Sequence, residues 1–237
     1  MAIALVTGGT RGIGYAVAQA LLARGDSVVV TGTTDESAQR AEKALAAEFD
    51  DATRVVGLAC DVRDRASVLR TVATVVQRFG GLDVLVNNAG VGVGAPIAAL
   101  AEEEWHRLID TNLTGIFHCC QAAIEPLKAR GGGWIINVSS LAGKNPFAGG
   151  AAYCATKAGV DAFSEALMQE LRYDGIRVSY VCPGSVATGF NGRAPDSGAE
   201  WKLHPEDVAQ VIVDLLSHPL RSLPSRIEIR PSQPPRK

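Results

Sequence analysis

Tyr153 and Lys157 are the two residues whose types and spacing most directly suggest chemistry. Because they are four positions apart, both side chains leave the same face if residues 151–172 form a helix. A phenol with a reference pKa of about 10 is a slow acid at neutral pH, and a neighbouring ammonium stabilises the phenolate and lowers that pKa. The same spacing also occurs on ordinary helix surfaces, so its meaning depends on what else the chain brings to this place.

Ser140 lies thirteen residues before Tyr153, directly after the apolar run 134–139. If that run is a strand, Ser140 stands at its carboxyl end, where ligands bind in open α/β sheets. A hydroxyl there can donate to a carbonyl oxygen and stabilise the alkoxide that forms when the carbonyl carbon is reduced. Ser139 is the alternative, since side-chain alternation places the two serines on different sides of a strand.

The glycine-rich segment 7–14, Thr-Gly-Gly-Thr-Arg-Gly-Ile-Gly, joins the first apolar run to a helical pattern. Glycines let the backbone turn sharply and approach a pyrophosphate, whose charge meets free N–H groups and the positive end of a helix dipole. An ordinary turn is the simpler interpretation, but the position between strand and helix favours dinucleotide binding. The predicted contacts are Gly8, Thr10, Arg11, Gly12, Ile13 and Gly14.

The end of the second expected strand indicates which dinucleotide is used. An acidic residue about 20 residues beyond the glycine loop would accept from a free ribose 2′-hydroxyl, but this strand ends at Gly32. Thr33, Thr34 and Arg11 could instead hold a 2′-phosphate, which favours NADP(H) over NAD. The alternative is that Asp35 reaches back to the ribose and Arg11 is only solvated. An oxidised nicotinamide would add a second positive charge beside the phenol.

Apolar runs bounded by turn residues alternate with amphipathic stretches, which is typical of repeated βαβ units. The predicted fold class is α/β, a single Rossmann-type doubly wound parallel sheet of about seven strands with helices on both faces. The strands are expected at residues 2–7, 27–31, 54–59, 84–87, 134–139, 177–182 and 226–230.

No shift in composition marks a linker, so the sequence predicts one domain over residues 1–230. The proline-rich ending at 231–237 is predicted to be a loosely held tail. The first helix is expected at 14–24, ended by Gly25 in a left-handed conformation. Residues 189–201 are expected to form a mobile loop before a helix that begins at Pro205.

The composition of the chain limits the kinds of molecule that it is expected to bind. The formal net charge is −2, which offers no electrostatic footprint for nucleic acid or an anionic membrane. The opening residues are too short for a secretory leader, and no apolar run reaches the roughly 18 residues of a membrane span, so we expect a soluble, cytoplasmic protein. The five cysteines form no C-x-x-C pair, and neither a disulfide framework nor a metal site is expected.

Taken together, these residues resemble the short-chain dehydrogenase/reductase family, and are similar to its NADP-using 3-oxoacyl-(acyl carrier protein) reductases. The resemblance spans nearly the whole chain. The matching motifs are Thr7-Gly8-x-x-x-Gly12-x-Gly14, Asn87-Asn88-Ala89-Gly90, Thr111-Asn112-Leu113, Ser140, Tyr153-x-x-x-Lys157 and Pro183-Gly184-x-x-x-Thr188.

The resemblance implies a role for each matched residue. Tyr153 would donate the proton, Ser140 would polarise the carbonyl, and Lys157 would bind the nicotinamide ribose and lower the phenol pKa. Asn112 would hold a water that connects Lys157 to solvent. The further cofactor contacts implied are Asp61 and Val62 beside the adenine, with Asn87, Ala89, Gly90, Pro183, Gly184, Val186 and Thr188.

The resemblance also implies a homotetramer or a dimer, packed through the helices that carry Asn112 and Tyr153. Two departures limit what is carried over. The segment between Thr188 and Pro205 is shorter than the substrate lid of many relatives, and the chain lacks the family's usual glycine-containing apolar ending. The substrate and the tetramer interface are therefore not inherited from the resemblance.

The sequence thus predicts an enzyme that transfers a hydride from NADPH to a small ketone or aldehyde, with a 3-oxoacyl thioester as one possible substrate. An NAD-dependent alcohol dehydrogenase is the alternative enzyme. A dinucleotide-sensing protein without catalysis is the alternative from another class, because a fold does not dictate a function.

Overall fold

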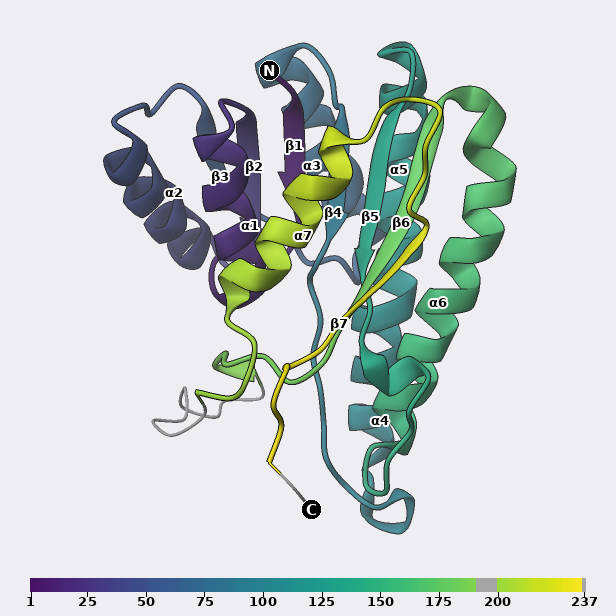
Figure 1. Ribbon diagram of the computed structural model, residues 1–237. Coiled ribbons are helices and arrows are strands. Elements are labelled where there is room, and N and C mark those ends of the chain that lie inside the picture. Colours follow the sequence, from purple (N-terminus) through teal and green to yellow (C-terminus); the bar gives the residue numbers. More distant parts are fainter. Residues whose placement is uncertain (191–199, 236–237) are drawn as a thin grey trace.

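The computed structural model describes residues 1–190 and 200–235 (Figure 1). Its centre is a seven-stranded parallel sheet with strand order β3-β2-β1-β4-β5-β6-β7. The predicted fold class is confirmed, and every predicted strand boundary lies within one residue of the observed one. The strands are β1 Ile3–Val6, β2 Ser27–Gly32, β3 Val55–Ala59, β4 Val84–Asn87, β5 Gly133–Val138, β6 Ile176–Pro183 and β7 Arg226–Ile229.

Helices cover both faces of this sheet (Figure 1). Helices α1, α2 and α7 pack on one face, and α3, α5 and α6 pack on the other. A 3-10 turn at Leu141–Gly143 follows β5, and a π-helical turn at Asp110–Thr114 joins α4 to α5. The helices are α1 Gly12–Ala23, α2 Asp35–Phe49, α3 Arg65–Phe79, α4 Glu102–Ile109, α5 Gly115–Ala129, α6 Ala151–Leu171 and α7 Pro205–Ser217.

Side-chain alternation along the strands divides the interior into two apolar cores. In β1, Ala4 and Val6 face the core under α1 and α7, whereas Ile3 and Leu5 face the core under α3 and α5. All four residues of this strand are buried. A sheet buried on both faces needs near-continuous apolar strands, which is why these runs were recognisable in the sequence.

The structure bears on the predicted ends of three segments. Helix α1 begins at Gly12 rather than at residue 14, because the glycine loop passes directly into the helix. Gly25 has φ +92°, so the predicted left-handed ending is confirmed. Of the expected loop 189–201, residues 191–199 lie outside the described residues, as do 236–237 of the expected tail. Residues 231–235 contain no helix or strand.

Strand order reverses between β1 and β4, which are hydrogen-bonded neighbours. The chain leaves β1 toward β2 and β3, and leaves β4 toward β5, β6 and β7. In open α/β sheets, ligands bind outside the carboxyl ends of the strands at such a switch point. Among the described helices, none is both long enough and apolar enough to cross a membrane.

Candidate active site

A cleft of about 1120 Å³ opens at the carboxyl ends of the strands. Most of the predicted site residues line it, including the glycine loop, the loop after β2, and Ser140, Tyr153 and Lys157. Three predicted residues do not line it, namely Gly14, Asn87 and Asn112. The structure therefore brings nearly all of the predicted residues into one cleft, and the predicted roles of the other three remain predictions.

Two glycines shape the floor of the cleft at the glycine loop. Gly8 has φ +63° and Gly12 has φ +56°, which is the left-handed region that L-residues rarely adopt. A Cβ on Gly8 would lie 2.9 Å from the Cα of Ala89, so the loop also approaches the β4 end too closely for a side chain. The backbone is consequently bare on the side where a pyrophosphate would lie.

Asn88 holds this loop in place. Its Nδ2 donates to the carbonyl oxygens of Thr7 and Gly8, each at 3.0 Å, and its backbone N–H donates to the Thr7 hydroxyl at 3.0 Å. Gly14 has no room for a side chain because the Asn88 amide packs against it. Sequence reasoning missed Asn88 as a site residue, although it lies in the quoted motif and lines the cleft.

The Asn87 side chain lies inside the sheet and does not line the cleft, so its expected contact with the cofactor remains a prediction. Asn87 is the last residue of β4 and is 2% exposed. Its Nδ2 donates to Asn137 Oδ1 at 2.9 Å, inside the sheet. Strand alternation turns it away from the cleft and turns Asn88 toward it.

The loop after β2 and the start of α2 form one wall of the cleft, which we call the β2 wall. It consists of Thr33, Thr34, Ser37 and Arg40. Thr34 caps α2, with its hydroxyl accepting from the Ser37 N–H at 3.2 Å. Asp35 does not line the cleft, contrary to the alternative that placed it at the ribose. Ser37 and Arg40 were missed, although their three-residue spacing at the start of a helix places them on one face.

The Arg11 side chain contacts the segment after β6, and none of its hydrogen bonds that the structure shows among the described residues goes to the β2 wall. Its Nη1 donates to the backbone oxygen of Gly189 at 2.7 Å, which links the glycine loop to the segment after β6. Arg11 and Thr188 both line the cleft. The predicted role of Arg11 in binding a 2′-phosphate remains a prediction.

Asp61 and Val62 follow β3 and line the cleft as expected. Arg63, which was not predicted, pairs with Asp61 at 2.6 Å and lowers the pKa of that carboxyl. Val62 is buried, and a Cβ on Gly115 would lie 2.7 Å from its Cγ2. The first turn of α5 therefore packs against Val62 and holds this border of the cleft in place.

Ser140, Tyr153 and Lys157 form the opposite wall, which we call the α6 wall. Helix α6 carries Tyr153 and Lys157 one turn apart, and Ser140 follows the end of β5. The Lys157 Nζ lies 5.9 Å from the centre of the Tyr153 ring and donates to the Val138 oxygen at 2.9 Å. The predicted juxtaposition of a phenol, a cation and a hydroxyl is therefore present.

The pKa directions on the α6 wall differ from the simple expectation. Burial raises the pKa of the Tyr153 phenol, and the neighbouring Ser140 hydroxyl lowers it. Burial lowers the pKa of Lys157 to about 8, and the Asp161 carboxylate opposes this change. The sequence predicted a lowered phenol pKa with an oxidised nicotinamide alongside, and that remains a prediction for the cofactor-bound protein.

The two candidate serines have different hydroxyl partners. Ser139 is 4% exposed, and its hydroxyl donates to Asp161 Oδ1 and lies 3.3 Å from the Lys157 backbone oxygen. The Ser140 oxygen accepts from the Ala142 N–H at 3.1 Å, and its hydroxyl makes a hydrogen bond with the Tyr153 phenol in the cleft. The geometry favours Ser140 as the group that donates to a substrate.

Asn112 lies in the π-helical turn between α4 and α5 and is fully buried. Its Oδ1 accepts from the Val91 N–H at 2.8 Å, and its Nδ2 donates to the Val91 oxygen at 2.8 Å and to the Thr156 hydroxyl at 3.1 Å. The side chain thus ties the loop after β4 to α6. The water expected at Asn112 remains a prediction. π-Helical turns are frequent at functional sites.

Among the described residues, three aromatic side chains besides Tyr153 line the cleft, and one of them lies next to Tyr153. Phe147 and Phe190 both line it, and the Phe190 ring centre lies 6.1 Å from that of Tyr153. Trp201 lines it as well. Nothing in the sequence showed that these aromatic side chains would face the cleft.

A doubly wound sheet with a glycine-floored cleft at its switch point defines a protein of the Rossmann class. Within that class, residues 2–197 match the family described as short chain dehydrogenase. The chain therefore belongs to this family of oxidoreductases, as the sequence resemblance predicted.

Characterised relatives share the family but differ in substrate. The chain is 34% identical to a 3alpha-hydroxysteroid dehydrogenase of Mediterraneibacter gnavus, over 91% of this chain and 89% of the relative. It is 38% identical to a 3-oxoacyl-(acyl-carrier-protein) reductase of Haemophilus influenzae, over 78% and 74% respectively. A solved alcohol dehydrogenase from the archaeon Thermococcus sibiricus, complexed with 5-hydroxy-NADP, matches with a TM-score of 0.91 at 29% identity and covers 100% of both chains.

Proposed function

We propose that the protein is an NADPH-dependent reductase of ketones or aldehydes in which Tyr153 donates the proton. The observation that carries the proposal is the α6 wall, where Ser140, Tyr153 and Lys157 line the cleft that begins at the glycine loop. An acid, a hydrogen-bond donor and a cation are the groups that the reduction of a carbonyl requires.

The residues of the cleft fit a dinucleotide. Gly8 and Gly12 leave bare backbone at the start of α1, as a pyrophosphate requires. The β2 wall offers three hydroxyls and one guanidinium, and none of its four residues is acidic, which suits a 2′-phosphate. The structural relative from Thermococcus sibiricus was solved with an NADP derivative, which supports the same choice. The cofactor supplies the hydride when bound.

Each residue of the α6 wall is proposed to have its own role in the reduction. Ser140 donates to the carbonyl oxygen and stabilises the negative charge that grows on it. Tyr153 donates its phenolic proton to that oxygen, so that an alcohol leaves and a phenolate remains. Lys157 stabilises the phenolate with its charge and binds the nicotinamide ribose, and the water at Asn112 restores the proton from solvent.

The substrate is proposed to present an apolar body next to its carbonyl group, because Phe190 lies beside Tyr153 and Phe147 also lines the cleft. The relatives named above act on a steroid and on a 3-oxoacyl thioester, and both kinds of substrate have this character. We further propose that the protein is cytoplasmic and homo-oligomeric.

The test is NADPH consumption with a panel of 3-oxoacyl thioesters, β-ketoesters, steroids, quinones and sugars. Wild-type protein should reduce at least one member. Tyr153→Phe should bind NADPH with unchanged affinity, measured by cofactor fluorescence, while turnover falls by about 10²-fold or more. Undiminished turnover in this variant would overturn the assigned role of Tyr153.

A further inference from the structure

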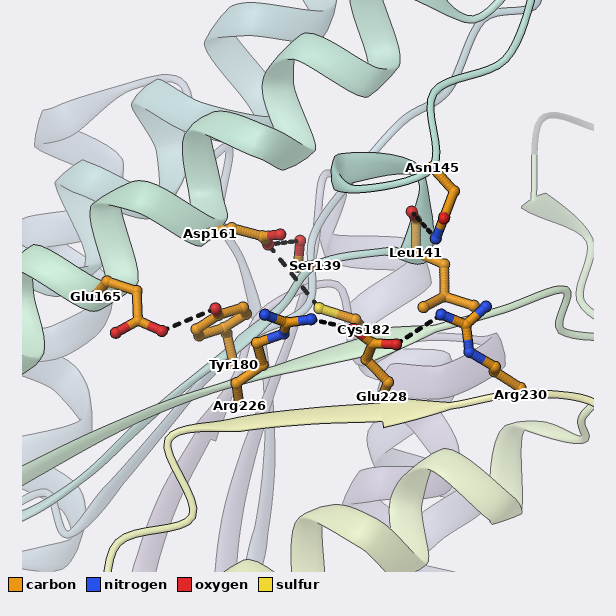
Figure 2. A network of polar contacts seen from close by, with 10 residues as sticks. All are labelled: Ser139, Leu141, Asn145, Asp161, Glu165, Tyr180, Cys182, Arg226, Glu228 and Arg230. Atoms are coloured by element: carbon orange, nitrogen blue, oxygen red, sulfur yellow. Dashed lines mark hydrogen bonds and ion pairs between the residues drawn. The ribbon is translucent and has the colours of Figure 1, made fainter.

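Helix α6 carries four polar side chains that repeat once per turn along one face. They are Tyr153, Lys157, Asp161 and Glu165. The first two belong to the α6 wall, and Asp161 was not among the predicted site residues. Figure 2 shows Asp161 pointing from α6 toward Ser139 and Cys182 at the sheet, with Glu165 farther along the helix. Asp161 is only 9% exposed, which is unusual for a carboxylate.

The Asp161 carboxylate touches both ends of the segment that presents Ser140. The Ser139 hydroxyl donates to Asp161 Oδ1. On the other side, a Cβ on Gly143 would lie 2.9 Å from Asp161 Oδ2, so this oxygen packs directly against the Gly143 backbone. Ser139 and Gly143 flank the segment in which Ser140 accepts from the Ala142 N–H. The carboxylate therefore fixes the strand end and the following turn to α6.

Asp161 is also the acidic side chain that most strongly affects Lys157. Lys157 is 5% exposed, and its ammonium makes one hydrogen bond to a backbone oxygen, that of Val138. The groups that act on it electrostatically are the Asp161 carboxylate, one turn along α6, and the Cys182 thiol of β6. An ammonium in such surroundings needs an opposite charge to remain protonated.

The other acids near Asp161 have partners of their own. Glu165 accepts from the Tyr180 hydroxyl of β6 at 2.9 Å. Glu228 of β7 pairs with Arg226 and, at 2.6 Å, with Arg230 (Figure 2). Asp161 Oδ2, by contrast, has no hydrogen-bond partner within the described part of the chain. Its negative charge is therefore the one left to balance Lys157.

We propose that Asp161 is a positioning residue that keeps Lys157 cationic and holds Ser140 in place, and thereby keeps the α6 wall active at alkaline pH. This inference rests on the proposed function, because it assigns Asp161 a part in that reaction. Asp161 does not line the cleft, and in this proposal it acts through Lys157 and through Ser139.

The expected pH dependence follows from the direction of the lysine pKa. Burial holds the pKa of Lys157 at about 8, and the carboxylate of Asp161 opposes a further decrease. The proposed reduction needs the ammonium, so turnover falls as pH rises through the lysine pKa. Asp161→Asn removes the charge with little change of shape, and the alkaline limb of the kcat profile should move down by about one pH unit.

Glu165→Gln is the matched control. It removes the same charge from the same helix face, two turns away from Lys157, and should leave the alkaline limb in place. The expected pattern is a shift in Asp161→Asn alone. An equal shift in both variants, or none in either, would show that Asp161 has no specific link to Lys157.

A direct titration separates this inference from the proposed function. The chain has six lysines, so their side-chain NMR signals can be followed individually; they are Lys43, Lys128, Lys144, Lys157, Lys202 and Lys237. Loss of one signal in Lys157→Arg assigns Lys157. Its pKa should fall by about one pH unit in Asp161→Asn and stay unchanged in Glu165→Gln. If the wild type reduces no carbonyl, the proposed function fails while this titration still tests the coupling.

The reciprocal measurement covers the case in which Asp161→Asn does not fold. Coupling between two charges acts equally on both, so Lys157→Met should raise the pKa of the Asp161 carboxyl, read from its carboxyl carbon signal. An Asp161 signal that is the same with and without the Lys157 charge would overturn the inference.

Discussion

The β2 wall and the α6 wall face the same cleft but are built in opposite ways. Thr33, Thr34 and Arg40 are exposed, and their hydrogen bonds and ion pairs stay within the first turns of α2. Lys157 is buried and lies near Asp161, which contacts Ser139 directly after β5 and Gly143 in the turn that follows. The residues proposed to select the cofactor therefore lie where a substitution disturbs few other contacts. The residues proposed to carry the chemistry lie where each polar group depends on its neighbours.

The largest effect is expected on the α6 wall. Lys157→Met removes the cation that stabilises the Tyr153 phenolate, and turnover should fall by about 10²-fold or more. Steady-state kinetics with NADPH and the best substrate of the panel would measure this loss. Lys144→Met is a control for the loss of a lysine charge on an exposed turn, and it should retain wild-type kcat. Equal losses in both variants would contradict the special role of Lys157.

A smaller effect is expected where both walls meet the glycine loop. Gly8→Ala forces an L-residue to φ +63° and brings a Cβ within 2.9 Å of Ala89 Cα. The left-handed backbone alone costs about 1–2 kcal/mol, so NADPH affinity or the free energy of unfolding should fall accordingly. Binding calorimetry would measure the NADPH affinity and thermal unfolding would measure the stability, so that the two effects can be told apart.

Gly94→Ala is the matched control, because nothing lies within 4 Å of its added methyl group and its φ is not positive. It should change neither quantity by more than about 0.5 kcal/mol. If Gly8→Ala behaves like this control, the glycine loop is not as closely packed as the structure shows.

These expectations also show where sequence reasoning worked and where it could not. The strands were predictable because a sheet covered on both faces needs unbroken apolar runs, such as 134–138. Tyr153, Lys157 and Ser140 were predictable because helical spacing and strand ends are local features. Asp161 continues the four-residue spacing of Tyr153 and Lys157, but its burial depends on Gly143 and Ser139. Those contacts arise only when α6 packs on the sheet.

The side chains that line the cleft were harder to predict than the loops that carry them. Asn87 and Asn88 are neighbours of the same type, and a shift of one residue at the end of β4 decides which of them lines the cleft. Arg11 was assigned to the 2′-phosphate from its charge, whereas its guanidinium donates to Gly189, which is 178 residues away in the sequence. No local pattern contains that contact.

On the β2 wall, Thr33→Asp should reverse the preference between cofactors. A carboxylate there accepts from a free ribose 2′-hydroxyl and repels a 2′-phosphate, so the ratio of kcat/KM for NADPH to that for NADH should fall about tenfold or more. Asp35→Asn is the control, because Asp35 does not line the cleft and its loss should leave the ratio unchanged. An increased ratio in Asp35→Asn would show that this carboxylate does reach the ribose.

The smallest effect is expected for Arg40, the exposed cation of the same wall. Arg40 pairs with Glu36 at 3.5 Å, and both side chains are largely exposed, so breaking that pair alone changes little. Arg40→Ala should raise KM for NADPH by about threefold and leave KM for NADH unchanged, since only NADPH carries the additional phosphate. The difference should shrink at high salt, because exposed charges are screened. Arg70→Ala removes an equally exposed arginine from α3, outside the cleft, and should alter neither KM. A rise in KM for both cofactors in Arg40→Ala would mean that the guanidinium supports the loop after β2 rather than the phosphate, and the β2 wall would then select NADPH through its hydroxyls alone.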